Sequence, residues 1–230
     1  MALAAAGWFS FERVWNSAGW IAAADSLRGG EPLPPARLEA GIARLGSLHD
    51  PDGAELGALA LLHYAAAEHA IARNDIEGWR RELTEAAEAA KRGLSVAPTR
   101  ADLALVLAEV EFLQHGAGAA VYAPLALSYR LAPRELWIAQ RRVELGLRLL
   151  AVAPPEIGDA VMSDVRMLGE PFRDTSRYRI LAQAALAAGP AAVTAVEREL
   201  GRGHLWPFQI FERDLAELSA QRAAAPTGQP

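Results

Sequence analysis

Apolar residues recur along most of this chain at the three- and four-residue spacing of helices that bury one face. Two of these stripes are formed by Leu103, Leu107, Val110 and Leu113, and by Leu136, Val143, Leu147 and Leu150. No segment shows the strict alternation of apolar and polar residues that a half-buried strand requires. The pattern therefore predicts an all-α fold.

Helix-breaking residues interrupt these stripes at a regular interval. Prolines 98, 133 and 171 are separated by 35 and 38 positions, and Gly118, Pro154 and Pro190 by 36 and 36. Proline ends a helix because it lacks an N–H donor and clashes with the preceding turn. One series is expected to end the second helix of each pair, and the other to mark the turn within the pair. Such a period is typical of stacked antiparallel helical hairpins, and predicts a short α-solenoid.

The breakers also set the expected helix boundaries. The first helix is expected over Ala4–Leu27, and the second begins at Pro35, since proline suits the first helical turn. The later helices are expected over 56–74, 76–96, 100–115, 121–131, 134–152, 156–168, 176–188, 191–200 and 208–220, the last as a cap. The chain is thus divided into an amino-terminal helix (1–30), a helical-repeat domain (31–222) and a disordered tail (223–230).

The amino-terminal helix is rich in aromatic residues. Trp8, Phe11 and Trp15 follow helical spacing, and Trp20 follows them. Such a stripe suits a bilayer interface or a docking subunit, because indole rings favour the membrane–water boundary. The alternative is that the aromatic residues cover the first hairpin. The apolar run over 1–11 is shorter than the roughly 20 residues that cross a bilayer, so the segment is not expected to span one.

Charge and cysteine content narrow the function. The formal net charge is −5, so no basic field is present that would attract nucleic acid, and no nucleic-acid partner is expected. The absence of cysteine excludes disulfides, thiolate nucleophiles and thiolate metal sites.

The histidines and carboxylates show no catalytic pattern along the sequence. The five histidines are His49, His63, His69, His115 and His204. None of them pairs with another at the i+3 or i+4 spacing of a helical metal site, so structural or surface roles are expected. Glutamates such as Glu82, Glu85 and Glu88 have no neighbouring acid or histidine at a spacing that indicates acid–base catalysis. The sequence therefore predicts no metal, no cofactor and no enzymatic activity.

The predicted helix over 134–152 carries the best candidate binding surface. Trp137, Arg141, Glu144 and Arg148 recur at i, i+4, i+7 and i+11, and Arg134 lies beside this face, as does Arg142. Guanidinium groups next to an indole can hold a carboxylate or phosphate, or stack on a sugar or peptide. Trp137, Arg141, Arg148 and Arg134 are therefore predicted to contact a partner. The alternative is a solvated face with an ordinary Glu144–Arg148 pair.

A second aromatic cluster lies near the carboxyl terminus. The segment His204-Leu-Trp-Pro-Phe208 precedes the last predicted helix. It is predicted to make the contacts that cap the fold, and a docking surface is the alternative.

Two segments end predicted hairpins with an apolar residue, a spacer and proline, namely Gly93-Leu-Ser-Val-Ala-Pro98 and Leu127-Ser-Tyr-Arg-Leu-Ala-Pro133. In this respect residues 54–200 resemble a degenerate tetratricopeptide repeat protein. The Trp-Leu-Gly-Tyr series of the family's first helix is missing: Trp137 falls about two positions early, and Leu107-Ala108 with Glu111 keeps a fragment.

The run over 127–150 also resembles helical-repeat parts of bacterial envelope proteins linked to polysaccharide assembly. These resemblances imply binding rather than catalysis, because helical repeats present an extended surface to partners. They favour a non-enzymatic scaffold or accessory subunit of a bacterial membrane complex, on the periplasmic side. The alternatives are a cytoplasmic adaptor, or a small-ligand-binding protein or enzyme with a pocket between hairpins.

Overall fold

The computed structural model describes residues 17–27, 31–171 and 175–224, and every regular element in these ranges is an α-helix. The predicted all-α class is therefore confirmed. The chain divides into two compact units, Met1–Leu131 and Ala132–Pro230. They are called the first unit and the second unit, and each is described by itself.

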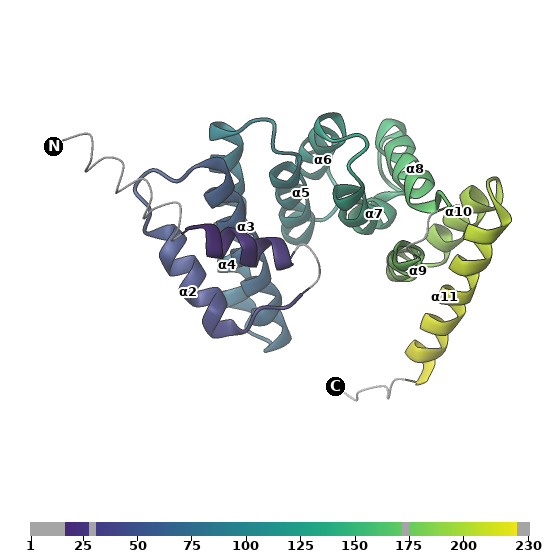
Figure 1. The fold of residues 1–230 in the computed structure, drawn as a ribbon, viewed down its shortest axis with the longest axis horizontal. Helices are drawn as coiled ribbons and strands as arrows, with labels where there is room; N and C mark the ends of the chain where they lie inside the picture. The colour runs from purple at the N-terminus through teal and green to yellow at the C-terminus, as the bar shows by residue number, and fades with distance from the viewer. Residues whose placement is uncertain (1–16, 28–30, 172–174, 225–230) are drawn as a thin grey trace. The chain divides into compact units, whose positions relative to one another are not determined.

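In its described residues, the first unit has a helix over residues 17–27 and five further helices (Figure 1). These are α2 (Pro35–Gly46), α3 (Gly53–Ala72), α4 (Ile76–Val96), α5 (Ala101–His115) and α6 (Ala119–Leu131). Helices α3 and α4 form one antiparallel hairpin and α5 and α6 form the next, and α4 and α5 join them by packing together. This is the predicted arrangement of hairpins.

Helix α3 is the centre of the first unit because it is covered on several sides, by α2, α4 and α5. Its apolar residues occur around the whole helix, and Leu56, Ala60 and Leu62 are each at most 1% exposed. Asp52 begins the helix by accepting hydrogen bonds from the N–H groups of Ala54 and Glu55 at 2.8 and 2.9 Å. The buried residues of this helix include two polar ones, Glu55 and His63.

The second unit contains two hairpins and a terminal helix. Its helices are α7 (Leu136–Leu149), α8 (Pro155–Gly169), α9 (Ser176–Ala188), α10 (Pro190–Gly201) and α11 (Leu205–Ala224). Helix α7 pairs with α8 and α9 with α10, and α7 also packs on α9 and α8 on α10. Helix α11 lies against α9 and α10, with Phe211 fully buried, as expected of a capping helix.

The two series of helix breakers fall where the spacing places them. Pro98, Pro133 and Pro171 each follow the second helix of a hairpin, α4, α6 and α8. Of the second series, Gly118 and Pro154 lie in the turns within hairpins, and Pro190 is the first residue of α10, directly after the turn residue Gly189. Gly116 and Gly189 have φ angles of 75° and 106°, a region that favours glycine because it has no Cβ.

Some expected boundaries differ from the structure. Helix α11 begins three residues before the predicted start at 208 and continues to Ala224, so residues 223 and 224 belong to a helix. The rest of the predicted tail, 225–230, and residues 4–16 of the predicted first helix lie outside the described residues. The solenoid form and the single repeat domain over 31–222 stay predictions.

Candidate functional site

A pocket of about 380 Å³ opens in the first unit between α2, α3 and α4. Its lining combines small or apolar residues with charged ones. The lining residues are Glu39, Ile42, Ala43, His63, Ala66, Ala70, Arg73, Asp75, Arg81, Glu82 and Glu85. Its volume lies in the range of roughly 300 to 1,000 Å³ that is usual for small-ligand sites.

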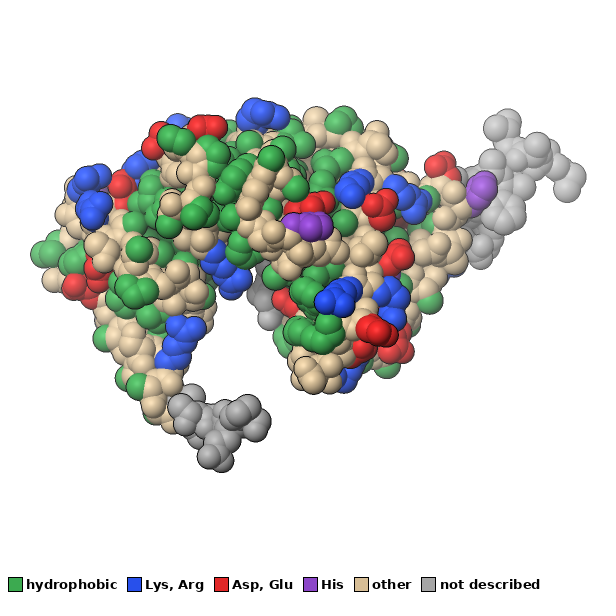
Figure 2. Space-filling model, turned by 180° about the vertical axis from the view of Figure 1, so that it is seen from behind, with side chains coloured by type: hydrophobic (Ala, Val, Ile, Leu, Met, Phe, Trp, Pro, Cys, Tyr) green, Lys and Arg blue, Asp and Glu red, His purple; other side chains and the backbone are tan. Residues whose placement is uncertain are grey.

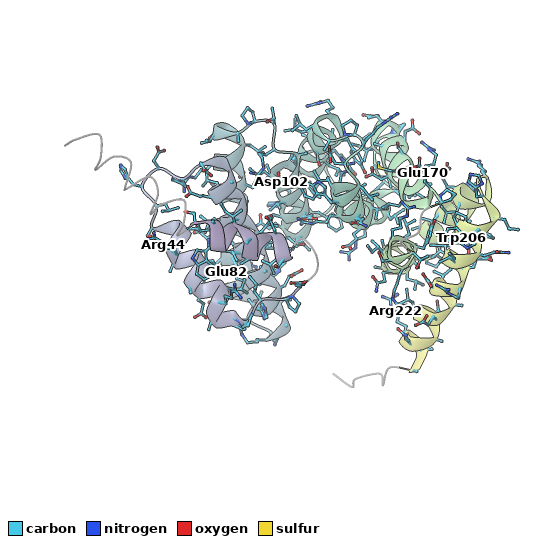
Figure 3. All side chains as sticks on the ribbon, in the orientation of Figure 1. Arg44, Glu82, Asp102, Glu170, Trp206 and Arg222 are labelled. Atoms are coloured by element: carbon cyan, nitrogen blue, oxygen red, sulfur yellow. The ribbon has the colours of Figure 1, made fainter. Side chains whose placement is uncertain are left out.

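Two of the lining residues, His63 and Glu82, form a histidine–carboxylate pair. His63 Nδ1 lies 2.8 Å from Glu82 Oε2, although the two residues are 19 positions apart. The side chains of His63 and Glu82 are 11% and 16% exposed, so the contact is largely protected from water. Arg81 donates from Nε and Nη2 to the other oxygen, Glu82 Oε1, at 3.2 and 3.0 Å. Figure 3 labels Glu82 in the first unit.

The α3–α4 turn places these side chains in the same pocket. Asn74 has a φ of 59°, which reverses the chain within a short loop. Asp75 then caps α4 by accepting a hydrogen bond from Gly78 N–H at 2.9 Å. With the antiparallel pair fixed in this way, His63 in the middle of α3 faces Glu82 in the second turn of α4.

The sequence interpretation of these residues was incomplete. His63 was expected to be structural or on the surface, and Glu82 to lie on a solvated helix face. The structure brings the two side chains together in the lining of one pocket. The sequence contains one indication of this site, because His63 is a polar residue within a largely apolar helix. Its partner could not be identified before the pairing of α3 with α4 was known.

The predicted partner-binding residues lie on or next to α7. Trp137 is 44% exposed, Arg134 and Arg148 are exposed, and Arg141 is half-buried. Desolvation raises the pKa of Glu144 above its usual range, and Arg141 and Arg148 on the same helix oppose this shift. The face that the helical spacing predicts is formed by Trp137, Arg141, Glu144 and Arg148, and Arg134 precedes α7. We call Trp137, Arg141 and Arg148 the α7 surface.

Arg142, which the sequence placed beside this face, is not part of it. Its side chain is fully buried and makes two hydrogen bonds to Asp164, each 2.9 Å long. Arg142 Nη1 also donates to the carbonyl oxygen of Ala132 at 2.9 Å. Because Arg142 makes these three hydrogen bonds in the core, it stabilises the packing of the second unit and is not available to a partner.

The predicted docking residues at the amino terminus are only partly described. Trp8, Phe11 and Trp15 lie outside the described residues. Trp20 packs against the core of the first unit, and its ring lies directly over Gly41 of α2. In the described part of the chain no helix is both long and apolar enough to cross a bilayer.

The carboxy-terminal aromatic cluster is partly packed against the second unit and partly exposed. Pro207 is buried, and the Trp206 ring meets Tyr178 of α9 edge to face at 6.0 Å. Leu205 and Trp206 nevertheless remain 69% and 46% exposed. Figure 3 labels Trp206 in the second unit.

Charges on the described surface are mixed in sign. Figure 2 shows basic and acidic side chains interspersed among apolar ones on the face that it presents. In the ranges 17–27, 31–171 and 175–224, no three His, Asp or Glu side chains are grouped so that they could hold a metal ion. Comparison of the chain with protein-family models, curated proteins and solved structures gives no match.

Proposed function

We propose that this protein is a non-enzymatic scaffold or accessory subunit of a bacterial membrane-associated complex, and that it binds a protein partner through the α7 surface. The carrying observation is that a half-exposed tryptophan, Trp137, lies on one helix face with Arg141 and Arg148. Tryptophan and arginine are the residue types that most often dominate the energy of protein interfaces.

The α7 surface offers a partner both apolar area and hydrogen-bond donors. An indole that is 44% exposed still has apolar area to bury. The exposed guanidinium group of Arg148 can form paired hydrogen bonds with a carboxylate of a partner. The resemblance to envelope polysaccharide-assembly proteins supports a periplasmic partner in such a complex.

The test begins with purification of the tagged, full-length protein from gently solubilised native membranes. We expect a membrane protein to copurify at near-unit ratio, and the Arg141→Ala/Arg148→Ala variant to lose most of it. Arg80→Ala/Arg92→Ala is the matched control, because it removes the same charge from exposed positions of α4. Equal recovery of the partner by both variants would remove the α7 surface from the proposal.

A small-ligand-binding function is the second candidate. It is supported by the pocket of about 380 Å³ in which α3 and α4 bring His63 and Glu82 together. The two functions are separable, because the pocket belongs to the first unit and the α7 surface to the second.

A further inference from the structure

We propose that the pocket between α2, α3 and α4 binds an ammonium or guanidinium group carried on an aliphatic chain. The proposal specifies the ligand of the second candidate function, and it does not depend on the α7 surface. Three features of the pocket support it: its negative charge, an available acceptor nitrogen and the apolar residues in its lining.

The pocket carries an excess of negative charge. Four carboxylates and two guanidinium groups line it, which leaves a formal charge of −2 while His63 is neutral. The carboxyl-terminal end of α3, near Ala70 and Arg73, adds the negative end of a helix dipole. An anion would have to approach all of these groups, whereas a cation would be stabilised by them.

Two of the carboxylates remain available to a ligand. Glu82 is already bound to His63 and Arg81, and Asp75 caps α4. Glu39 on α2 and Glu85 on α4 are exposed, and in the part of the chain that the structure describes neither makes a hydrogen bond or an ion pair. They come from different helices, so a cation between those helices can be held from more than one direction.

The acceptor nitrogen belongs to His63. This residue is 9% exposed and lines the pocket. An ionised carboxylate can only accept hydrogen bonds, so the Nδ1 atom that faces Glu82 carries a proton, and in the neutral form of the ring Nε2 carries none. Nε2 is then an acceptor, and it has no hydrogen bond from the described residues. A lone pair on a buried ring, with its tautomer fixed, suits an N–H donor of the ligand.

The remaining lining suits the chain that carries the cation. Ile42, Ala66 and Ala70 supply an apolar surface next to the charged groups. The aliphatic part of a lysine, an arginine or a diamine packs on such a surface while its charged end reaches polar groups. The same chemistry is found in a free amine and in the basic side chain of a partner protein.

The test is a titration of the full-length protein with agmatine, a guanidinium on a four-carbon chain that ends in an amine, followed by calorimetry and by NMR of the histidine rings. We expect binding with a shift of the His63 ring signals. Glutarate, an anion of similar length, is expected to give neither. An unmoved His63 signal at saturation, or tighter binding of glutarate than of agmatine, would overturn the proposal.

Paired variants separate the local site from the overall charge. Glu39→Gln/Glu85→Gln removes two carboxylates from the pocket, and we expect agmatine affinity to fall by about tenfold or more. Glu77→Gln/Glu88→Gln makes the same change of charge at exposed positions of α4 outside the pocket lining, and less than about a twofold loss is expected there. Similar losses in both variants would also refute the site.

A peptide then distinguishes the source of the cation. Acetyl-Gly-Arg-Gly-amide carries the same guanidinium without a free amine. Binding about tenfold tighter than that of agmatine would assign the pocket to an arginine of a partner protein. Otherwise the pocket is assigned to a free amine. Because neither probe involves α7, a failure here would leave the proposed scaffold function to its own test.

Discussion

Arg142 and Asp164 form a two-point ion pair in the core of the second unit, with Nε and Nη2 of the arginine each 2.9 Å from a carboxylate oxygen. The side chains are 0% and 2% exposed. The pair joins α7 to α8, and its third hydrogen bond ties the carbonyl of Ala132 to the same arginine. Among the arginines of α7, Arg142 therefore has a structural role.

Removal of one partner of this pair should be costly. Asp164→Ala would leave a buried guanidinium without its counter-charge, and we expect a loss of about 3–5 kcal/mol in the stability of the second unit. Hydrogen exchange of α7 and α8 amides measures it without assuming that both units unfold together. Arg166→Ala, which removes the exposed partner of the ion pair with Glu199, is the control and should cost about 1 kcal/mol or less. Equal costs would show that burial of the pair is unimportant.

Two glycines of α2 should respond to alanine in opposite directions. A Cβ at Gly41 would lie 2.8 Å from Leu62 Cδ1 and 2.9 Å from Trp20 Cε3, whereas a Cβ at Gly46 would meet nothing within 4 Å. Overpacking costs about 1–3 kcal/mol, and alanine gains up to about 1 kcal/mol of helix propensity. We therefore expect Gly41→Ala to lower the stability of the first unit and Gly46→Ala to leave it unchanged or raise it.

Hydrogen exchange of α3 amides is the measurement for both glycine variants. The comparison also tests the position of Trp20. If Gly41→Ala were as stable as Gly46→Ala, the Trp20 ring would not lie over α2, and docking of this tryptophan elsewhere would regain support.

The amino-terminal cap of α3 should contribute measurably to the first unit. Asp52 accepts two backbone hydrogen bonds, and Glu55 completes the capping box by accepting from the Asp52 N–H at 2.9 Å. We expect Asp52→Ala to cost about 1 kcal/mol and Asp52→Asn much less, because asparagine also caps helices. Urea unfolding followed by hydrogen exchange in α3 provides the measurement. A similar loss in both variants would mean that charge, and not the cap, is responsible.

The carboxy-terminal aromatic contact should stabilise the packing of α11. Trp206 and Tyr178 meet edge to face with an interplanar angle of 88°. Edge-to-face pairs contribute about 0.5–1.5 kcal/mol beyond area burial, so Trp206→Ala is expected to destabilise α11 by about 1 kcal/mol or more. Leu205→Ala, at a side chain that is 69% exposed, should change stability by less than about 0.5 kcal/mol. Exchange rates of α11 amides distinguish the two variants.

The helices themselves were well predicted from the sequence. The expected range for α4, 76–96, and that for α9, 176–188, match the structure at both ends. In both cases the boundary depends on local chemistry: an acidic cap or a polar residue before the helix, and an alanine-proline or glycine-proline step after it. Such signals act over a few residues, so they can be found without knowledge of the rest of the chain.

The α7 surface and the pocket differ in how much of each could be predicted from the sequence. The α7 surface follows from helical spacing within a single element, so Trp137 and Arg148 could be placed on one face in advance. The pocket could not be found in this way, since Glu39, His63 and Glu85 come from three helices. Sequence spacing gives the relative directions of side chains along one helix, but not the rotation of that helix against its neighbours.

Local signals predicted the all-α class, several helix boundaries and the pairing of helices into hairpins, because periodicity, caps and prolines are local properties of the chain. Which polar residues are buried, and which groups they contact, depends on how the helices pack in three dimensions. Arg142 and Arg148 are similar in sequence context, yet one lies in the core and the other is exposed. That difference, like the meeting of His63 with Glu82, is set by which faces of neighbouring helices pack together.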